Sequence, residues 1–229
     1  ISASLDSTVR VWDVTKGHST VYPVQRAPLS HTLYKDLVMT ASATEYLDML
    51  DPRDSDTQSI RLSSSITAVQ STDLGLLLGT DDGNLVLLDM RMRKPYQVIH
   101  ITSANLPISK ISGTQDITVT SFDGSVCLLD DSIPICVRRE YNRARIYGSC
   151  IGSCCIGISG RDDFVVSGSK EGKVYIWEPG GTKFTIKHNG GVVNDCIPIK
   201  NFIGAFATCD SSGSLSMFVC DFNRLSWVN

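Results

Sequence analysis

The sequence predicts an all-β fold made of repeated antiparallel sheets of four strands, and three observations lead to this prediction. The segments ISASLDSTVRVWD (1–13) and FVVSGSKEGKVYIWE (164–178) are near-copies of one strand–turn–strand unit. Weaker copies lie in the same frame, spaced by about 40 residues along the chain. Apolar residues recur with a period of two, rather than 3.6, almost everywhere. A repeat of this length is typical of the blades of a β-propeller.

Each unit keeps the same spacing between a turn and a large apolar residue. The turn markers fall at Asp6, Thr44, Asp82, Asp123, Glu171 and Ser212. The large apolar residues, six positions later, are Trp12, Leu50, Leu88, Leu129, Trp177 and Phe218. An acid follows in the first five units, at Asp13, Asp51, Asp89, Asp130 and Glu178. This spacing predicts one marked hairpin on each of six blades.

Short apolar or β-branched segments bounded by Gly, Asp or Ser predict the strands around these turns. The third strand of a unit is clearest in TVRVW (8–12), LVLLD (85–89), SVCLLD (125–130) and KVYIW (173–177). Tight turns with a Gly available for positive φ are DDG (81–83), FDG (122–124), KEG (170–172) and SSG (211–213). Further strands are predicted at 59–63 and 66–70, at 96–101 and 107–112, and at 183–187 and 192–199. These segments give four strands per repeat.

The order of these features resembles the WD-repeat propeller family over essentially the whole chain. In that family a blade is often tied by a hydrogen-bonded set of His, Ser or Thr, Asp and Trp. The first unit matches the last three at Ser2, Asp6 and Trp12. The resemblance implies that these residues are structural, with the Trp12 ring buried and its N–H group near Ser2.

The fifth and last units match the same set in part. The residues of the fifth unit at these positions are Ser167, Glu171 and Trp177. Those of the last unit are His188, Thr208, Ser212 and Phe218. An unpaired indole N–H is costly in a core, so we expect Trp177 to be buried beside Ser167. Leucine at the Trp position of units two to four cannot donate such a bond, so those blades must rely on apolar packing.

The repeat fills the chain from end to end, which predicts a single propeller domain over residues 1–229. A chain of 229 residues buries roughly 70% of its unfolded surface, enough for a substantial core. The sequence begins without Met and in the middle of a repeat. We therefore expect about six blades of a ring that is incomplete at its N-terminus, and the resemblance to WD-repeat scaffolds implies seven blades in the full ring.

Charge and hydropathy indicate which partners to expect. The chain holds 21 Lys and Arg against 24 Asp and Glu, a formal net charge of −3. This balance argues against direct nucleic-acid binding, which depends on neutralising phosphates. No apolar run approaches the roughly 18 residues of a membrane span, and no secretory signal opens the sequence. We expect an intracellular protein, cytoplasmic or nuclear, that binds other proteins and no membrane.

The cysteines and histidines do not form a recognisable chemical site. No CxxC pair occurs, and no His lies beside a plausible Ser or Cys nucleophile. The best reading of the thiols is that they are small buried apolar groups in a reducing compartment, with a metal site as the alternative. We predict no catalytic residue, no metal and no cofactor, and hence no enzyme. The cysteines are Cys127, Cys136, Cys150, Cys154, Cys155, Cys196, Cys209 and Cys220.

The residue just before each turn marker is the first candidate for binding. In propellers that this chain resembles, that position projects at the narrow face near the central channel. The candidates are Leu5, Asp81, Phe122 and Lys170. An exposed aromatic residue such as Phe122 is the type expected at a binding hot spot. The alternative is packing of these side chains against a neighbouring loop.

A second candidate is the basic connection VRREYNRARIYG (137–148), which lies in the longest interval between units. Long loops often carry recognition, and a basic cluster suits an acidic partner. The alternative is a solvated strand end that pairs with Glu140 and the acids at 162 and 163. The basic candidates are Arg138, Arg139, Arg143 and Arg145.

The third candidate is LLDMR (87–91), which resembles the Trp-Asp-x-Arg box of substrate receptors of cullin-RING ubiquitin ligases. Asp89 and Arg91 match the box, and Leu88 replaces its aromatic residue. This motif makes a substrate-receptor adaptor of such a ligase the alternative function.

Three segments are similar to WD-repeat scaffolds of the MAP-kinase organiser type. They are TDDGNLVLLDMRM (80–92), TSFDGSVCLLD (120–130) and SGRDDFVVSGSKEGKVYIWE (159–178). The resemblance implies a non-catalytic scaffold that assembles signalling or RNA-processing complexes on its faces. Kinase-cascade or spliceosomal proteins are the implied partners, and we expect a monomer within a larger complex.

Overall fold

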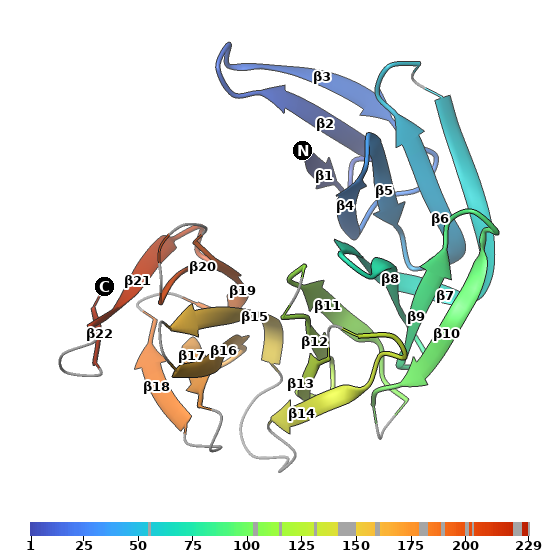
Figure 1. The fold of residues 1–229 in the computed structure, drawn as a ribbon. Coiled ribbons are helices and arrows are strands. Elements are labelled where there is room, and N and C mark those ends of the chain that lie inside the picture. Colours follow the sequence, from blue (N-terminus) through green and yellow to red (C-terminus); the bar gives the residue numbers. More distant parts are fainter. Residues whose placement is uncertain are drawn as a thin grey trace. The chain divides into compact units, whose positions relative to one another are not determined.

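The regular structure of the chain is entirely β. The computed structural model describes residues 1–54, 56–102, 105–114, 116–130, 132–141, 150–158, 161–178, 183–188, 191–199, 202, 204–221 and 226–228. These residues form 22 strands and no helix (Figure 1). Neighbouring strands pair antiparallel, as in the first and fourth sheets along the chain. The all-β prediction is confirmed.

The first two sheets contain ten strands. The first has the order β1-β2-β3, with strands β1 (Ser2–Ser4), β2 (Thr8–Asp13) and β3 (His18–Pro23). The second has the order β10-β9-β8-β7-β6-β5-β4. Its strands are β4 (Ser30–Tyr34), β5 (Leu37–Ala41), β6 (Thr44–Asp51), β7 (Asp56–Thr72), β8 (Gly75–Thr80), β9 (Asn84–Asp89) and β10 (Lys94–His100).

Strand β7 is shared by two groups of four strands. Its residues 56–61 pair with β6, and its residues 68–72 pair with β8. Both pairings shift register next to Ile66, where the strand passes from one group to the other. The segments 59–63 and 66–70, predicted as separate strands, are therefore one continuous strand, and the seven-stranded sheet holds two repeat units.

The remaining three sheets have four strands each, in chain order. The third sheet contains β11 (Ile108–Ser112), β12 (Thr118–Ser121), β13 (Val126–Leu129) and β14 (Val137–Tyr141). The fourth contains β15 (Cys150–Ile158), β16 (Arg161–Ser169), β17 (Lys173–Trp177) and β18 (Lys183–Lys187). The fifth contains β19 (Val193–Pro198), β20 (Ala205–Asp210), β21 (Leu215–Asp221) and β22 (Ser226–Val228). Each predicted turn marker lies in or next to a separate hairpin turn.

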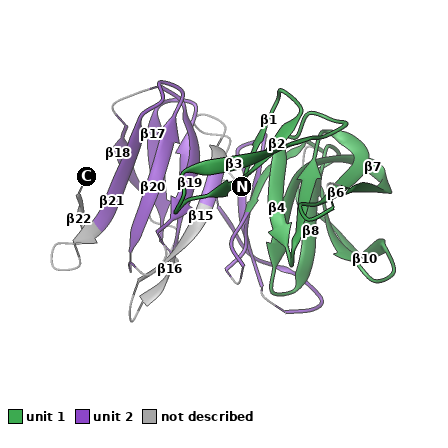
Figure 2. Cartoon of the chain, turned by 90° about the horizontal axis from the view of Figure 1, so that it is seen from above, with its two compact units in different colours: residues 1–111 green, residues 112–229 purple. Residues whose placement is uncertain are grey.

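The chain divides into two compact units, residues 1–111 and residues 112–229 (Figure 2). The division falls at the end of β11. Unit 1 holds β1 to β10 and most of β11, and unit 2 holds the strands from β12 onward. The prediction of a single domain over residues 1–229 stays a prediction.

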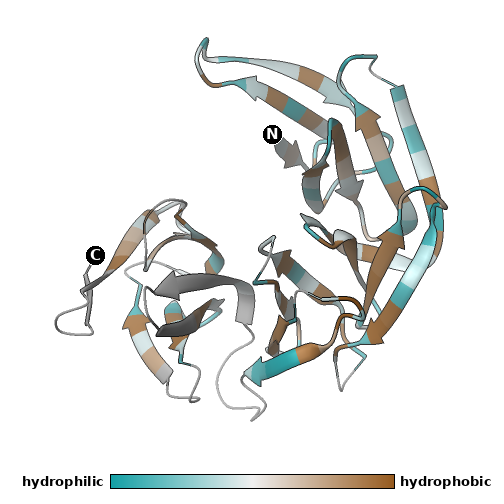
Figure 3. Ribbon diagram, viewed as in Figure 1, coloured by the Kyte–Doolittle hydropathy of each residue, from teal (hydrophilic) through white to brown (hydrophobic). Residues whose placement is uncertain are grey.

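The core of each unit comes from strands that are buried on both faces. In β9, the four consecutive residues Leu85, Val86, Leu87 and Leu88 are all buried. Strand β10 at the edge of the same sheet differs, because none of its residues is buried and its polar and apolar residues are mixed (Figure 3). Burial on both faces is what a central strand of a stacked sheet requires.

Polar side chains tie adjacent sheets together within each unit. The Thr67 hydroxyl donates to the backbone oxygen of Ile108 at 2.7 Å, which joins β7 to β11. In unit 2, the hydroxyl groups of Thr120 and Ser153 form a buried hydrogen bond between β12 and β15. These bonds satisfy hydroxyl groups that would otherwise be costly to bury.

The tryptophan of the fifth unit lies where the sequence predicts it. Trp177 is 7% exposed and donates its indole N–H to Ser167 Oγ at 3.1 Å. The ring packs against Tyr141 and Tyr175, with centroid distances of 6.0 and 6.1 Å. The predicted burial and hydrogen bond of Trp177 are both confirmed.

The tryptophan of the first unit keeps its hydrogen bond, but the prediction that it is buried is wrong. Trp12 donates its indole N–H to Ser2 Oγ at 2.9 Å, yet its side chain is 47% exposed. Side chains alternate along β2, and Val9 and Val11 face the cluster that includes Val38 of the next group. Trp12 therefore takes the opposite face of the three-stranded sheet, away from this cluster.

This difference predicts unequal costs for the two tryptophans. Trp177→Ala should lower the free energy of unfolding by about 3–5 kcal/mol, the range for a large buried aromatic residue. Trp12→Ala should lower it by about 1–2 kcal/mol, since half of its ring already meets water. Urea denaturation followed by circular dichroism measures both values, and equal losses would contradict the assignment.

Candidate functional site

Side-chain oxygens hold the marked hairpin turns in place. Asp6 Oδ1 accepts hydrogen bonds from the Thr8 amide (2.9 Å) and the Thr8 hydroxyl (2.7 Å). Asp123 Oδ1 accepts the same two bonds from Ser125, at 2.8 and 2.6 Å. These hydrogen bonds fix the conformation of the hairpin tip. The positive φ predicted for the turn glycines is confirmed, with values of 80°, 83°, 70° and 83° at Gly83, Gly124, Gly172 and Gly213.

The four candidate residues at these tips are exposed. Leu5 is 71% exposed and Phe122 is 51% exposed. Asp81 and Lys170 are also exposed. Leu5 and Asp81 belong to unit 1, whereas Phe122 and Lys170 belong to unit 2. Each unit therefore presents one apolar and one charged tip residue to solvent.

The basic connection is described only at its start. Arg138 and Arg139 are exposed on β14, the outermost strand of the third sheet. The pairing of β13 with β14 shifts register between Val137 and Arg139, so Arg138 is the additional residue of a bulge. Arg143 and Arg145 lie outside the described residues. The structure thus places two of the four predicted arginines, at the edge of a sheet.

In the last unit, an aspartate that the shared spacing does not predict organises the turn. The marker position holds Ser212, and the aspartate is Asp210, two residues earlier. Its Oδ1 atom accepts bonds from the Ser212 hydroxyl (2.6 Å) and the Ser214 amide (3.0 Å). Its Oδ2 atom lies 3.0 Å from Nδ1 of the buried His188. His188 therefore has an aspartate beside it, and that aspartate lies two residues before the predicted marker position.

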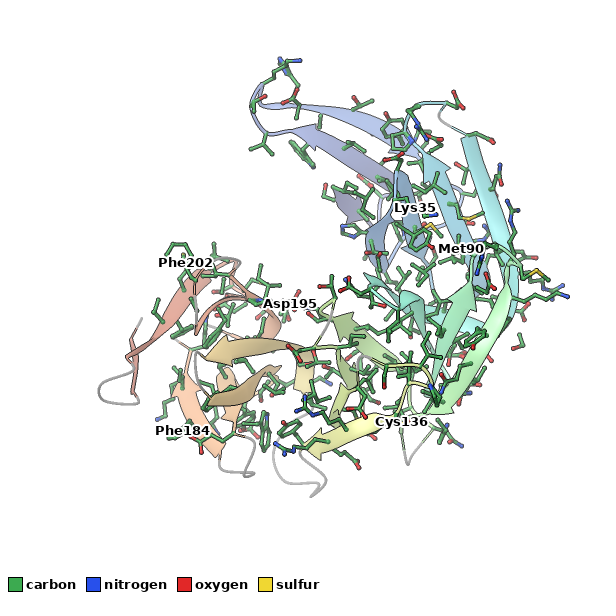
Figure 4. The ribbon with its side chains drawn as sticks, in the orientation of Figure 1. Lys35, Met90, Cys136, Phe184, Asp195 and Phe202 are labelled. Atoms are coloured by element: carbon green, nitrogen blue, oxygen red, sulfur yellow. The ribbon has the colours of Figure 1, made fainter. Side chains whose placement is uncertain are left out.

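A groove in unit 1 is a second candidate surface, and sequence analysis did not find it. Three turns form it, those of β4–β5, β6–β7 and β9–β10, and its volume is about 470 Å³. Figure 4 labels two of its lining residues, Lys35 from the first turn and Met90 from the last. We call it the unit 1 groove. A volume of this size is within the range of ligand sites.

The turns of the unit 1 groove lie at the strand ends opposite to the hairpin tips. Strand β5 runs from the groove at Leu37 to the tip at Ala41. Strand β9 runs the other way, from the tip at Asn84 to the groove end at Asp89. Unit 1 therefore offers two separate surfaces for binding, one at each end of its strands.

The acids that follow the large apolar residues cap the turns at this end. Asp89 Oδ1 accepts the backbone N–H of Arg91 at 2.8 Å, and Asp51 Oδ1 accepts that of Arg53 at 3.0 Å. Asp13 Oδ1 accepts the Thr15 amide in the same way, at 3.1 Å. Hydrogen bonds from the Arg53 side chain are the main reason that the pKa of Asp51 lies below its ordinary value. In these three units the repeated acid is thus explained by turn geometry.

The described residues offer little for metal chemistry or membrane insertion. No group of three or more His, Cys, Asp or Glu within them could hold a metal ion. No helix in the same part of the chain could cross a membrane. Cys127, Cys136, Cys196 and Cys209 are not in disulfides.

Comparison with known proteins identifies the fold. No family model matches the sequence, and no curated protein matches it. Among solved structures, the chain is similar to the β-propeller domain of Cps50 (Swd1) from Myceliophteria thermophila, with a TM-score of 0.78. The two share 16% identity, and the match covers 93% of this chain and 77% of the other. In all, 1338 chains of solved structures match, so the fold is common and does not by itself select a function. The predicted β-propeller fold is confirmed.

The Asp210 network predicts a specific dependence of stability on pH. Hydrogen bonds, first of all from the Ser212 hydroxyl, hold the pKa of Asp210 below its ordinary value of 3.8. The carboxylate therefore stabilises the folded state above about pH 4, and this contribution is lost as the pH falls through the lowered pKa. Asp210→Asn should reduce the free energy of unfolding at pH 7, and this reduction should shrink progressively as the pH falls below about 4. Urea denaturation over a series of pH values from 7 downward tests this, and an effect that does not change with pH would contradict it.

Proposed function

We propose that this protein is a non-catalytic scaffold that binds other proteins through the hairpin tips of its propeller blades. The Phe122 tip is the observation that carries the proposal. The Gly124 amide donates to the Ser121 carbonyl at 3.0 Å and closes the turn around Phe122. Ser121 and Ser125 are buried on either side, while the Phe122 ring is 51% exposed. The turn thus holds a large apolar side chain in water.

An exposed aromatic ring on a rigid turn suits protein recognition. Little conformational entropy is lost when such a group is covered, because the turn already holds the backbone and an aromatic side chain has only two torsion angles. Aromatic residues are also enriched among the few that dominate binding energy. Leu5 supplies an apolar tip in unit 1, and Lys170 supplies a charged tip in unit 2. We propose these three residues as partner contacts.

Arg138 and Arg139 are proposed as part of a separate site for an acidic partner. Both are exposed on an outer strand, and opposite charges there would speed association more than they raise affinity. The undescribed Arg143 and Arg145 belong to the same proposal. We also propose kinase-cascade or spliceosomal proteins as partners, a monomer within a larger complex, and a cytoplasmic or nuclear location.

The ubiquitin-ligase adaptor remains the weaker proposal. Its support is the match at Asp89 and Arg91, and Arg91 has a side chain that is 95% exposed. The Asp89 carboxylate, however, caps the turn in the way that Asp13 does, where Thr15 stands in place of the Arg of the box. A structural role accounts for half of the motif, which favours the general scaffold.

The scaffold proposal predicts that Phe122→Ala weakens a partner without unfolding the domain. A hot-spot aromatic residue contributes on the order of tenfold or more in affinity. The melting temperature should change by only about a degree or two, because the ring is already half exposed. Affinity purification of the tagged protein from cells, with quantitative mass spectrometry, measures the loss of co-purified proteins.

Phe202→Ala is the matched control for this experiment. Phe202 is 68% exposed and lies in the β19–β20 turn, at the strand ends opposite to the tips of unit 2. Its substitution should leave the co-purified proteins in place. If Phe122→Ala also leaves every partner bound, or if it unfolds the domain, the tip proposal fails.

A further inference from the structure

We propose that the unit 1 groove binds a short extended segment of a protein partner, one with an apolar side chain between two residues of opposite charge. This site lies at the strand ends opposite to the hairpin tips and goes beyond the proposed function. Its floor, its two charged walls and the backbone of its turns each point to such a segment.

The floor of the groove is apolar and continuous with the core. Met49 lines it and is 5% exposed. Leu37 and Met90 also line it, and both pack against the same core cluster as Met49. Unbranched methionine side chains adapt to different apolar shapes and are frequent at surfaces that bind peptides. The floor therefore suits an aliphatic or aromatic side chain.

One wall of the groove is acidic. The β6–β7 turn contributes three carboxylates and one guanidinium group to the lining. Arg53 is held by Asp51, with two bonds of 3.1 Å, and lies 3.6 Å from Asp36 of the β4–β5 turn, so that its charge is matched. The other two carboxylates, of Asp54 and Asp56, leave the wall with an excess of negative charge.

The facing contribution, from the β9–β10 turn, is basic. Arg91 and Arg93 both line the groove. Arg91 reaches the Asp89 carboxylate only at 3.9 Å and is almost fully exposed. Arg93 donates to Gln58 Oε1 at 3.0 Å, which positions the guanidinium group and leaves its charge unmatched. A partner that fits both walls must place a base near the first and an acid near the second.

The backbone of the turns supports a binding role. Lys35 and Arg93 have φ of 55° and 52°, in the left-handed region. Glycine and asparagine adopt this conformation at lower cost, so long basic residues there are not explained by turn geometry. Both side chains line the groove. Strained positions of this kind collect at functional sites.

Synthetic peptides test the proposal by fluorescence anisotropy with the 229-residue chain. The first peptide has a central leucine, a lysine two residues before it and a glutamate two residues after it, and the second has the reverse order. A third has the same composition with lysine and glutamate adjacent at one end, and a fourth has glycine in place of leucine. The better of the first two should bind at least about fivefold more tightly than the third and fourth, and added salt should weaken it.

A charge reversal of the basic wall shows where the peptide binds. Arg91→Glu with Arg93→Glu should weaken the better peptide by roughly five- to tenfold, since each exposed ion pair changes affinity by a small factor. The same variant should gain affinity for a peptide with lysine on both sides of leucine. Met90→Gln, which keeps the length of the side chain, should reduce the preference for leucine over glycine.

Lys16→Glu is the matched control, because Lys16 lies in the corresponding β2–β3 turn, beside Asp13, and does not line the groove. It should leave peptide binding unchanged, as should Phe122→Ala, which separates this proposal from that of the tips. The proposal is overturned if the four peptides bind alike to the unaltered protein. It is also overturned if Lys16→Glu weakens binding as much as the double reversal.

Discussion

The structure depends on the close approach of the second strand of one group of four strands to the first strand of the next group. A Cβ atom at Gly79 of β8 would lie 2.6 Å from Ile108 Cγ2 of β11. In unit 2, a Cβ atom at Gly168 of β16 would lie 2.6 Å from the backbone oxygen of Val193. Neither contact leaves room for a side chain, so glycine is required at both positions. This packing buries both faces of the inner strands, which a single four-stranded sheet cannot do.

Close packing of the inner strands has a consequence for function. Side chains at the turns cannot be buried in the core, because the strands on either side of each turn are already packed on both faces. Phe122 and Leu5 are therefore held in water despite their apolar side chains. The unit 1 groove lies over Met49, and residues of three turns line it. The fold holds the turns in fixed positions, and a few exposed residues on these turns determine which partners can bind.

The sequence predicts those features of the fold that depend on nearby residues. Hairpin turns follow from Asp or Ser and Gly at fixed offsets, and the glycines at 83 and 124 adopt the expected positive φ. The exposure of Trp12 could not be predicted in this way, because it depends on whether a second sheet covers the face of the first sheet that carries this residue. The role of Asp210 was also missed, since it lies two residues away from the shared marker position. The unit 1 groove brings together Lys35 and Arg93, which lie 58 residues apart in the sequence, and no local pattern links them.

Cross-linking mass spectrometry of the complex isolated from cells tests the central claim, that partners contact the hairpin tips and the unit 1 groove. Lysines at both surfaces make the test possible, with Lys170 at a tip and Lys35 in the groove. Lys16 is exposed in the β2–β3 turn and serves as the reference. The account predicts cross-links between partner proteins and Lys170 or Lys35, in excess of those to Lys16. Cross-links that reach only Lys16 would contradict it.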